Sequence, residues 1–277
     1  MNYFNFPLEE WTNWFIDNWF LPVFGRFFDT LGDFFTIILD AFTSFLLWIP
    51  PEILTIVLIV IAWRIANRRV ALFTLIGMLY IGSVGVWPEA MQTLAIVLVA
   101  TTLSIVVGIP MGIWSAKSNK VDKAVRPILD FMQTLPSFVY LIPVILLLGI
   151  GGVSAVFATF IYATPPAVRL TNLAIRQVPT DVVEAARAFG STSWQMLRKV
   201  QLPMAIPTIM AGVNQTIMMA LAMAVIAAMI GAPGLGATVL SGINNVNVGL
   251  GLVGGLGIVV LAIILDRVTE GLGQNKD

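Results

Sequence analysis

Long apolar runs with few charges constrain the fold of this chain more than any other feature. A helix needs about 20 apolar residues to cross the hydrocarbon core of a bilayer. Only 11% of the residues are charged, whereas a soluble domain carries about 25%. The sequence therefore predicts an all-α integral membrane protein with about seven transmembrane helices. The expected spans are Pro51–Ala66, Val70–Trp87, Met91–Trp114, Ile128–Ile150, Val153–Leu170, Ala205–Ile230 and Val248–Leu265.

The basic residues indicate how these spans are oriented, because cytoplasmic links are enriched in Lys and Arg. If the link after the first span is cytoplasmic, 14 of the 15 basic residues lie in the cytoplasm and only Arg26 lies outside. The opposite orientation places nearly all of them outside. We therefore expect a multi-pass protein of the cell membrane, with its N-terminus outside and its C-terminus in the cytoplasm.

The first fifty residues form a separate region that is acidic and rich in Trp and Phe. Six acidic residues occur here against the single Arg26. Within residues 24–49, apolar side chains recur at helical spacing on one side, with Asp29, Asp33 and Asp40 on the other, which predicts an amphipathic helix. Three charges on one stripe are costly in lipid, so we expect this helix to lie along the outer membrane surface. The alternative is an eighth span whose polar stripe packs against other helices.

Missing residue types exclude most kinds of site. The chain contains no His and no Cys, which excludes disulfides, thiolate nucleophiles, imidazole bases and almost all zinc sites. No G-x-x-x-x-G-K-[ST] segment occurs, so nothing is expected to hold ATP phosphates. A net charge of zero gives no support to a nucleic-acid partner. We expect no catalytic residue, no metal ligand and no cofactor bound by this chain.

Two other classes of membrane protein are weaker alternatives. An ion-coupled secondary transporter needs acidic or histidine groups in the middle of its spans, and the predicted spans are nearly free of them. An intramembrane enzyme needs a nucleophile with a base, or a metal site. Asp130 is the single acid near the start of a span, and we expect it at the cytoplasmic end beside Arg126.

Prolines and glycines interrupt several predicted spans, which indicates bends or re-entrant backbone. A further Gly-rich stretch, Gly231–Gly236, falls in an outer link. It forms either an external gate or docking surface, or a plain tight turn. The interrupting residues are Pro110, Pro136, Pro143, Gly149, Gly151, Gly152, Pro165 and Pro166.

The longest predicted cytoplasmic link runs from Thr171 to Met204 and contains signals for two short helices. Thr180 or Asp181 can cap the first helix, and Glu184 follows Asp181 at the spacing of a capping box. Gly190 suits the end of that helix.

Ser191 can cap a second short helix that ends near Leu202 and Pro203. Two short helices on the cytoplasmic face can be gripped by a soluble partner, which then pulls on the spans at both ends. The alternative is an ordinary basic loop between spans.

This segment carries a motif. Glu184-Ala185-Ala186, Gly190 and Val200-Gln201-Leu202-Pro203 resemble the EAA loop of ABC import permeases, E-A-A-x3-G-x9-I-x-L-P, with Val200 as the one conservative departure. In such permeases the loop is the coupling helix that docks in a cleft of a separate ATP-hydrolysing subunit. Glu184 either pairs with a basic group on the ATPase or caps its own helix. The resemblance implies that the ATPase contact is made by Asp181, Glu184, Ala185, Ala186, Phe189, Gly190, Leu202 and Pro203.

The same resemblance implies the fold of a type I ABC importer transmembrane domain in a bacterial cell membrane. The permease core corresponds to residues 87–270, after the acidic region 1–50 and accessory transmembrane helices in residues 51–86. ATP and Mg are expected on the partner ATPase, in two copies. Because one chain has one EAA loop and a dimeric ATPase offers two clefts, a second copy of this permease is expected. An extracellular or periplasmic solute-binding protein is the remaining partner.

Three further stretches suggest the substrate. Met132–Tyr140, Ala163–Arg169 and Gly231–Gly236 are similar to permeases for glycine betaine, proline betaine, choline and related compatible solutes (the OpuA type). The resemblance implies import of a quaternary ammonium or proline-type solute for osmoprotection. Another small solute, such as an amino acid, is the alternative.

Polar side chains within the predicted spans are candidates for a translocation path. A zwitterionic quaternary ammonium solute needs polar groups and aromatic faces in the pore but no matching charge. The same groups can instead form hydrogen bonds between helices. The candidates are Gln133, Thr134, Ser137, Tyr140, Asn214, Gln215 and Thr216.

Overall fold

The computed structural model describes residues 7–273, and every regular element within these residues is helical. The predicted all-α fold is therefore confirmed. Labels with η mark short 3-10 or π-helical turns. In chain order the elements are α1 (Leu8–Phe15), η1 (Ile16–Phe20), α2 (Leu21–Trp48), α3 (Pro51–Ile65), α4 (Arg68–Ser83), α5 (Trp87–Lys117), α6 (Asn119–Thr134), η2 (Ser137–Tyr140), α7 (Leu141–Leu148), α8 (Gly152–Arg176), α9 (Thr180–Ala188), α10 (Ser193–Met196), η3 (Leu197–Gln201), α11 (Leu202–Ile226), η4 (Ala227–Ile230), α12 (Leu235–Asn244) and α13 (Val248–Gly273).

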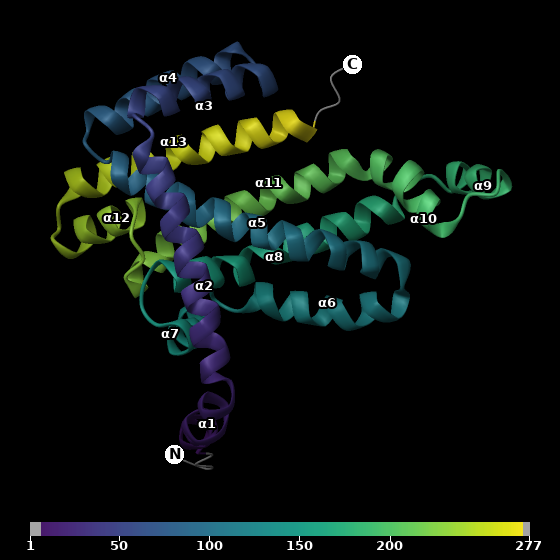
Figure 1. Cartoon of the computed structure of the whole chain (residues 1–277), viewed down its shortest axis with the longest axis horizontal. Coiled ribbons are helices and arrows are strands. Elements are labelled where there is room, and N and C mark those ends of the chain that lie inside the picture. The colour runs from purple at the N-terminus through teal and green to yellow at the C-terminus, as the bar shows by residue number, and fades with distance from the viewer. Residues whose placement is uncertain (1–6, 274–277) are drawn as a thin grey trace, which may run out of the picture.

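Four long helices, α5, α8, α11 and α13, form the centre of the molecule (Figure 1). Helix α8 packs against both α5 and α11, and α13 packs against α11. Small side chains permit the close approach of α5 and α8. A Cβ on Gly108 would lie 2.7 Å from the Cβ of Ala167, and a Cβ on Gly112 would lie 2.6 Å from that of Thr171. Such small-residue contacts are the usual way in which membrane helices associate.

Five helical stretches in the described residues are long and apolar enough to cross a bilayer, and six if one bent pair counts as a span. The expected spans Pro51–Ala66 and Val70–Trp87 are helical, but α3 has 15 residues and α4 has 16. Both are shorter than a straight crossing of the bilayer, which requires about 20 residues. The two helices pack against each other and against α13.

The expected span Ile128–Ile150 is not one straight helix. It is divided between α6 and α7, which meet at an angle of 107°. The reason is Pro136, which disfavours helical backbone at the preceding residue, and Leu135 is accordingly extended with ψ 135°. By contrast, Pro110 lies within a continuous α5, and Pro165 and Pro166 within a continuous α8. Among the predicted interruptions, the sharp bend therefore occurs where Pro136 stands.

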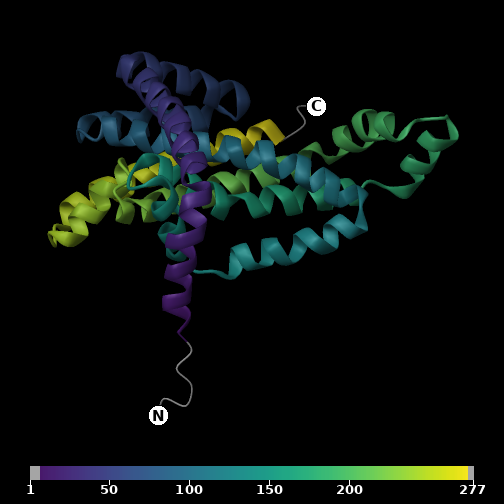
Figure 2. The same ribbon diagram turned by 60° about the horizontal axis from the view of Figure 1, so that its bottom comes forward.

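The N-terminal helix α2 lies across the bundle rather than along it, in both views (Figures 1 and 2). Phe35 packs edge-on against Phe157 of α8, with ring centroids 4.9 Å apart. Leu39 is buried against Gly152, where an added Cβ would lie 2.8 Å from the Leu39 Cδ2 atom. The face turned away from the bundle carries exposed Phe34 and Ile37.

The bundle has two distinct ends. Helices α9 and α10 project from one of them, called the loop end here, and α12 lies at the opposite, far end (Figure 1). At the loop end, Ile65 of α3 touches Gly271 of α13, and Arg176 of α8 reaches Ser115 of α5. The basic links 64–69, 117–126 and 176–199 therefore share one end of the molecule.

Candidate functional site

Helix α9 presents an exposed surface beyond the loop end of the bundle. None of the described residues of α9 is buried, and Asp181, Glu184 and Ala185 are exposed while Ala186 is half-buried. Phe189, directly after the helix, is 92% exposed. Its ring therefore makes almost no packing contact within this chain.

The start of α9 differs from the sequence prediction. The helix begins at Thr180 after Pro179, and no side chain caps its first turn. The predicted capping by Thr180 or Asp181, with Glu184 at the capping-box position, is therefore wrong. Pro179 itself fixes the entry, since its φ of −53° and ψ of 134° lead extended backbone directly into the helix.

Gly190 ends α9 as predicted. Its φ of +78° lies in the left-handed region, which glycine adopts without a steric penalty. The Gly190 N–H donates to the Arg187 carbonyl at 2.9 Å, and the Ser191 N–H donates to the Ala186 carbonyl at 3.1 Å. These two bonds form a Schellman motif, so the turn between the two short helices has a defined geometry.

The second helix begins one residue later than predicted and does not stop where predicted. Thr192, rather than Ser191, forms the cap: its hydroxyl accepts from Gln195 N at 3.3 Å, and Gln195 Oε1 accepts from Thr192 N at 2.9 Å. From α10 the chain continues through η3 into α11, so Leu202 and Pro203 begin a spanning helix. The π-helical turn η3 lies just before Pro203, where the helix must accommodate the missing proline N–H.

The base of the segment is fixed to the bundle by a small apolar cluster. Leu197 of η3 is 2% exposed. It packs with Ala174 and Ile175 of α8 and with Ala205 and Ile209 of α11. Between α9 and the ends of α5 and α8 lies a cavity of about 550 Å³, lined in part by Glu184, Arg187 and Arg176. The segment thus has an exposed outer face and a rigid inner base.

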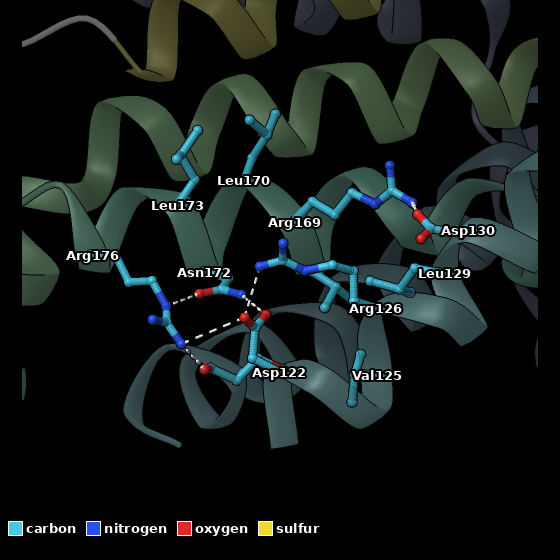
Figure 3. Close-up of a pocket in the computed structure, with 12 residues that line it drawn as sticks. Asp122, Val125, Arg126, Leu129, Asp130, Arg169, Leu170, Asn172, Leu173 and Arg176 are labelled. Atoms are coloured by element: carbon cyan, nitrogen blue, oxygen red, sulfur yellow. Dashed lines mark hydrogen bonds and ion pairs between the residues drawn. The ribbon is translucent and has the colours of Figure 1, made fainter. Parts of the chain in front are cut away.

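Beside this base, polar side chains connect α6 with α8 (Figure 3). Asn172 Nδ2 donates to Asp122 Oδ1 at 2.7 Å, and Arg176 Nε donates to Asn172 Oδ1 at 2.8 Å. Arg176 Nη2 lies 3.7 Å from Asp122 Oδ2. We call Asp122, Asn172 and Arg176 the α6–α8 latch. The sequence did not reveal it, because its members are far apart in the chain and two of them lie at the edges of apolar runs.

Asp130 lies one turn after Arg126 on α6, in keeping with its predicted place beside that residue, but its ion-pair partner comes from α8. Asp130 pairs with Arg169 of α8 at 2.5 Å, not with Arg126. Arg126 instead pairs with Asp122, one turn earlier on α6, at 2.7 Å. The helical spacing of four residues brings Arg126 and Asp122 together, and the close packing of α6 on α8 supplies Arg169.

The predicted path residues differ in burial and in hydrogen bonding. Tyr140 is buried and its hydroxyl donates to the Met132 carbonyl, while Thr216 donates to the Gly212 carbonyl at 2.9 Å. Asn214 donates to Asp266 of α13 at 2.7 Å. Ser137 is half-buried, and Gln133, Thr134 and Gln215 are exposed. Sequence reasoning missed Asp266 because the last apolar run appeared to end just before it.

The Gly-rich stretch Gly231–Gly236 is a turn bound to the start of α5. Gly231 is left-handed with φ +76°, and the N–H of Leu235 at the start of α12 donates to Thr93 Oγ1 at 2.8 Å. A Cβ on Gly234 would lie 2.4 Å from that oxygen. Close backbone approach therefore requires glycine here, and the role of the stretch as an external gate or docking surface stays a prediction.

Comparison with known proteins identifies relatives that match most of the chain. Residues 108–276 match the family described as "Binding-protein-dependent transport system inner membrane component". The chain is 50% identical over 270 residues to the "Glycine betaine/proline betaine transport system permease protein ProW" of Escherichia coli, covering 98% of this chain and 76% of that protein. It is 48% identical to the "Glycine betaine transport system permease protein OpuAB" of Bacillus subtilis, covering 98% and 95% respectively.

A solved structure agrees with the arrangement of the helices. A chain of the MetNI methionine ABC transporter in an inward-facing conformation superposes with a TM-score of 0.62 at 23% sequence identity. The match covers 67% of this chain and 93% of that one. This likeness concerns the fold.

Proposed function

The chain belongs to the family of binding-protein-dependent transport system inner membrane components. We propose that it is the membrane-spanning permease of an ATP-driven importer. The transported solute is glycine betaine or a related quaternary ammonium solute, as the names of relatives that are 50% and 48% identical suggest. ATP is hydrolysed by a separate chain, and this subunit performs no covalent chemistry.

The observation that carries the mechanism is the segment from α9 to η3, which is exposed on its outer face and anchored at its base. Phe189 is available for a partner, while Leu197 sits in the cluster shared by α5, α8 and α11. A displacement of α9 by a docked ATPase therefore moves the ends of spanning helices. Asp181, Glu184, Ala185, Ala186, Phe189 and Gly190 form the proposed contact. Leu202 and Pro203 belong to the start of α11 instead, where they receive the displacement.

The proposed orientation places the loop end in the cytoplasm. The basic links that share this end are the kind of sequence that stays inside. With the bundle crossing the membrane, α2 lies parallel to its plane near the outer surface, with Trp and Phe side chains at the headgroup level. The exposed rings of Trp11, Trp14 and Phe34 support this placement.

The proposed translocation path is narrower than the set predicted from sequence. Tyr140, Asn214 and Thr216 use their polar groups in hydrogen bonds within the bundle, so we assign them to helix packing. Gln133, Thr134 and Gln215 are exposed on helices of the bundle. Exposed amides such as those of Gln133 and Gln215 are costly against lipid, which favours a surface facing water or a second copy of the chain.

The proposed assembly is two copies of this permease, two ATPase chains and a solute-binding protein. Each permease contributes one α9 segment, and a dimeric ATPase offers two clefts, so a homodimer matches them one to one. Mg and ATP belong to the ATPase.

The test is reconstitution of the permease in liposomes with its candidate ATPase and binding protein. We expect labelled glycine betaine to accumulate only when ATP is present on the α9 side. Accumulation that follows an ion gradient without ATP identifies an ion-coupled transporter and contradicts the proposal. Preferential uptake of an amino acid rejects the betaine assignment but keeps the ATP-driven permease.

A further inference from the structure

Arg176 lies where the bundle meets the segment that carries α9. It is the last residue of α8, and only Gln177, Val178 and Pro179 separate it from the start of α9. Its side chain lines both the cavity under α9 and the cavity between α6 and α8. Along the chain, Arg176 is thus the residue of α8 nearest to α9.

The Arg176 guanidinium holds three elements together. Nη2 donates to the Ser115 carbonyl near the end of α5 at 2.9 Å, and Nη1 donates to Asn119 Oδ1 at the start of α6 at 2.9 Å. Nε donates to Asn172 on α8 itself, which in turn donates to Asp122 of α6. The planar fork of an arginine can satisfy several acceptors at fixed angles, which a lysine ammonium cannot reproduce.

Helix α6 depends on these polar contacts because it has little apolar packing of its own. Leu129 is its one buried side chain, whereas Ile128 and Phe131 are exposed. Polar contacts from α8 reach it through the α6–α8 latch, the Arg176–Asn119 hydrogen bond and the Arg169–Asp130 pair. Helix α6 then leads through the bend at Leu135 to α7. The α6 end of the bent pair therefore lies beside Arg176, while α7 at its other end packs against α8 and α2.

We propose that Arg176 is a positioning residue for transport, which ties the movement of α9 to α6 and hence to the bent α6–α7 pair. This inference rests on the proposed function, since it requires that an ATPase displaces α9. The continuous helix from η3 into α11 provides one route from the segment into the bundle, and Arg176 provides a second route to helices that the chain path alone does not connect. Arg176 acts through its neighbours and contacts neither ATP nor solute.

Arg126 offers a matched control. Both arginines contact the same carboxylate oxygen, Asp122 Oδ2. Arg126 lies on α6 itself and its side chain is 67% exposed, so it joins no two helices. R126Q and R176Q therefore remove the same charge from the same carboxylate, but only R176Q also removes hydrogen bonds that join α8 to α5 and α6.

The experiment compares both variants with the wild type in liposomes that contain the ATPase and binding protein. Glycine betaine uptake and ATP hydrolysis are measured together, along with ATPase affinity and thermal unfolding in detergent. We expect R176Q to lower the uptake per ATP hydrolysed by about tenfold, which is within the range for residues that carry coupling. ATPase affinity is expected to be unchanged, because the outer face of α9 is intact, and R126Q is expected to behave as wild type.

Several results decide the matter. R176Q with wild-type uptake per ATP, or R126Q with an equal loss, overturns the role of Arg176 while leaving the proposed function in place. If R176Q does not reach the membrane, R176K is measured instead. It keeps the charge but loses the fork, so wild-type coupling in R176K also overturns the inference. A wild-type protein without ATP-dependent uptake rejects the proposed function, and the role of Arg176 with it.

Discussion

Truncation of Phe189 tests the ATPase contact with little disturbance of the permease. Its side chain is 92% exposed, so Phe189→Ala removes almost no packing within this chain. If the ring is buried on docking, its transfer from water contributes about 1.5–3 kcal/mol. Since about 1.4 kcal/mol is a factor of ten in affinity, the Kd for the ATPase is expected to rise roughly 10- to 150-fold.

The assay is a titration of detergent-solubilised permease with labelled ATPase, together with thermal unfolding of the permease alone. The Tm is expected to remain at the wild-type value. Phe34→Ala is the matched control, because Phe34 is 56% exposed on α2, which packs near the far end of the bundle. An unchanged Kd for Phe189→Ala, or an equal loss for Phe34→Ala, refutes the contact.

Three further substitutions, with one control, test the supporting structure. Gly190→Ala forces a left-handed φ on a residue with a Cβ, at about 1–2 kcal/mol, and we expect amide exchange at the end of α9 to quicken roughly 5- to 30-fold by mass spectrometry. Leu197→Ala leaves a cavity at a residue that is 2% exposed, and a loss of about 2–5 kcal/mol is expected as a lower Tm with weaker coupling of uptake to hydrolysis. Gly112→Ala places a Cβ 2.6 Å from Thr171 and 2.7 Å from the Val168 carbonyl, so overpacking should lower the Tm. Gly82→Ala, with no atom within 4 Å of the added Cβ, should leave the Tm unchanged or raise it.

Local sequence signals predicted the long helices and the turn at Gly190, which depend on interactions between residues close together in the chain. Apolar runs gave α5, α8, α11 and α13 because a membrane helix satisfies its own backbone hydrogen bonds. The turn at Gly190 followed from its freedom to adopt positive φ. The cap of the second helix was misplaced by only one residue, because Ser191 and Thr192 are both good capping residues. The spacing to Gln195 selects Thr192.

Contacts between distant segments were not predictable in this way. Asp122 and Asn172 meet because Gly108 and Gly112 let α8 approach α5, from which α6 then folds back. The pairing of Asp130 with Arg169 has the same origin. The bend at Leu135 was signalled by Pro136, but Pro110 gives a similar signal within a continuous α5, so only the surrounding packing distinguishes them.

The most direct test that α9 drives this permease is to measure glycine betaine uptake and ATP hydrolysis together in reconstituted permease, ATPase and binding protein. We expect uptake to require ATP, and Phe189→Ala to lower uptake and betaine-stimulated hydrolysis together, with full recovery at high ATPase concentration. Uptake that continues without ATP, or that is indifferent to Phe189→Ala at low ATPase concentration, contradicts the claim that this chain is driven through α9.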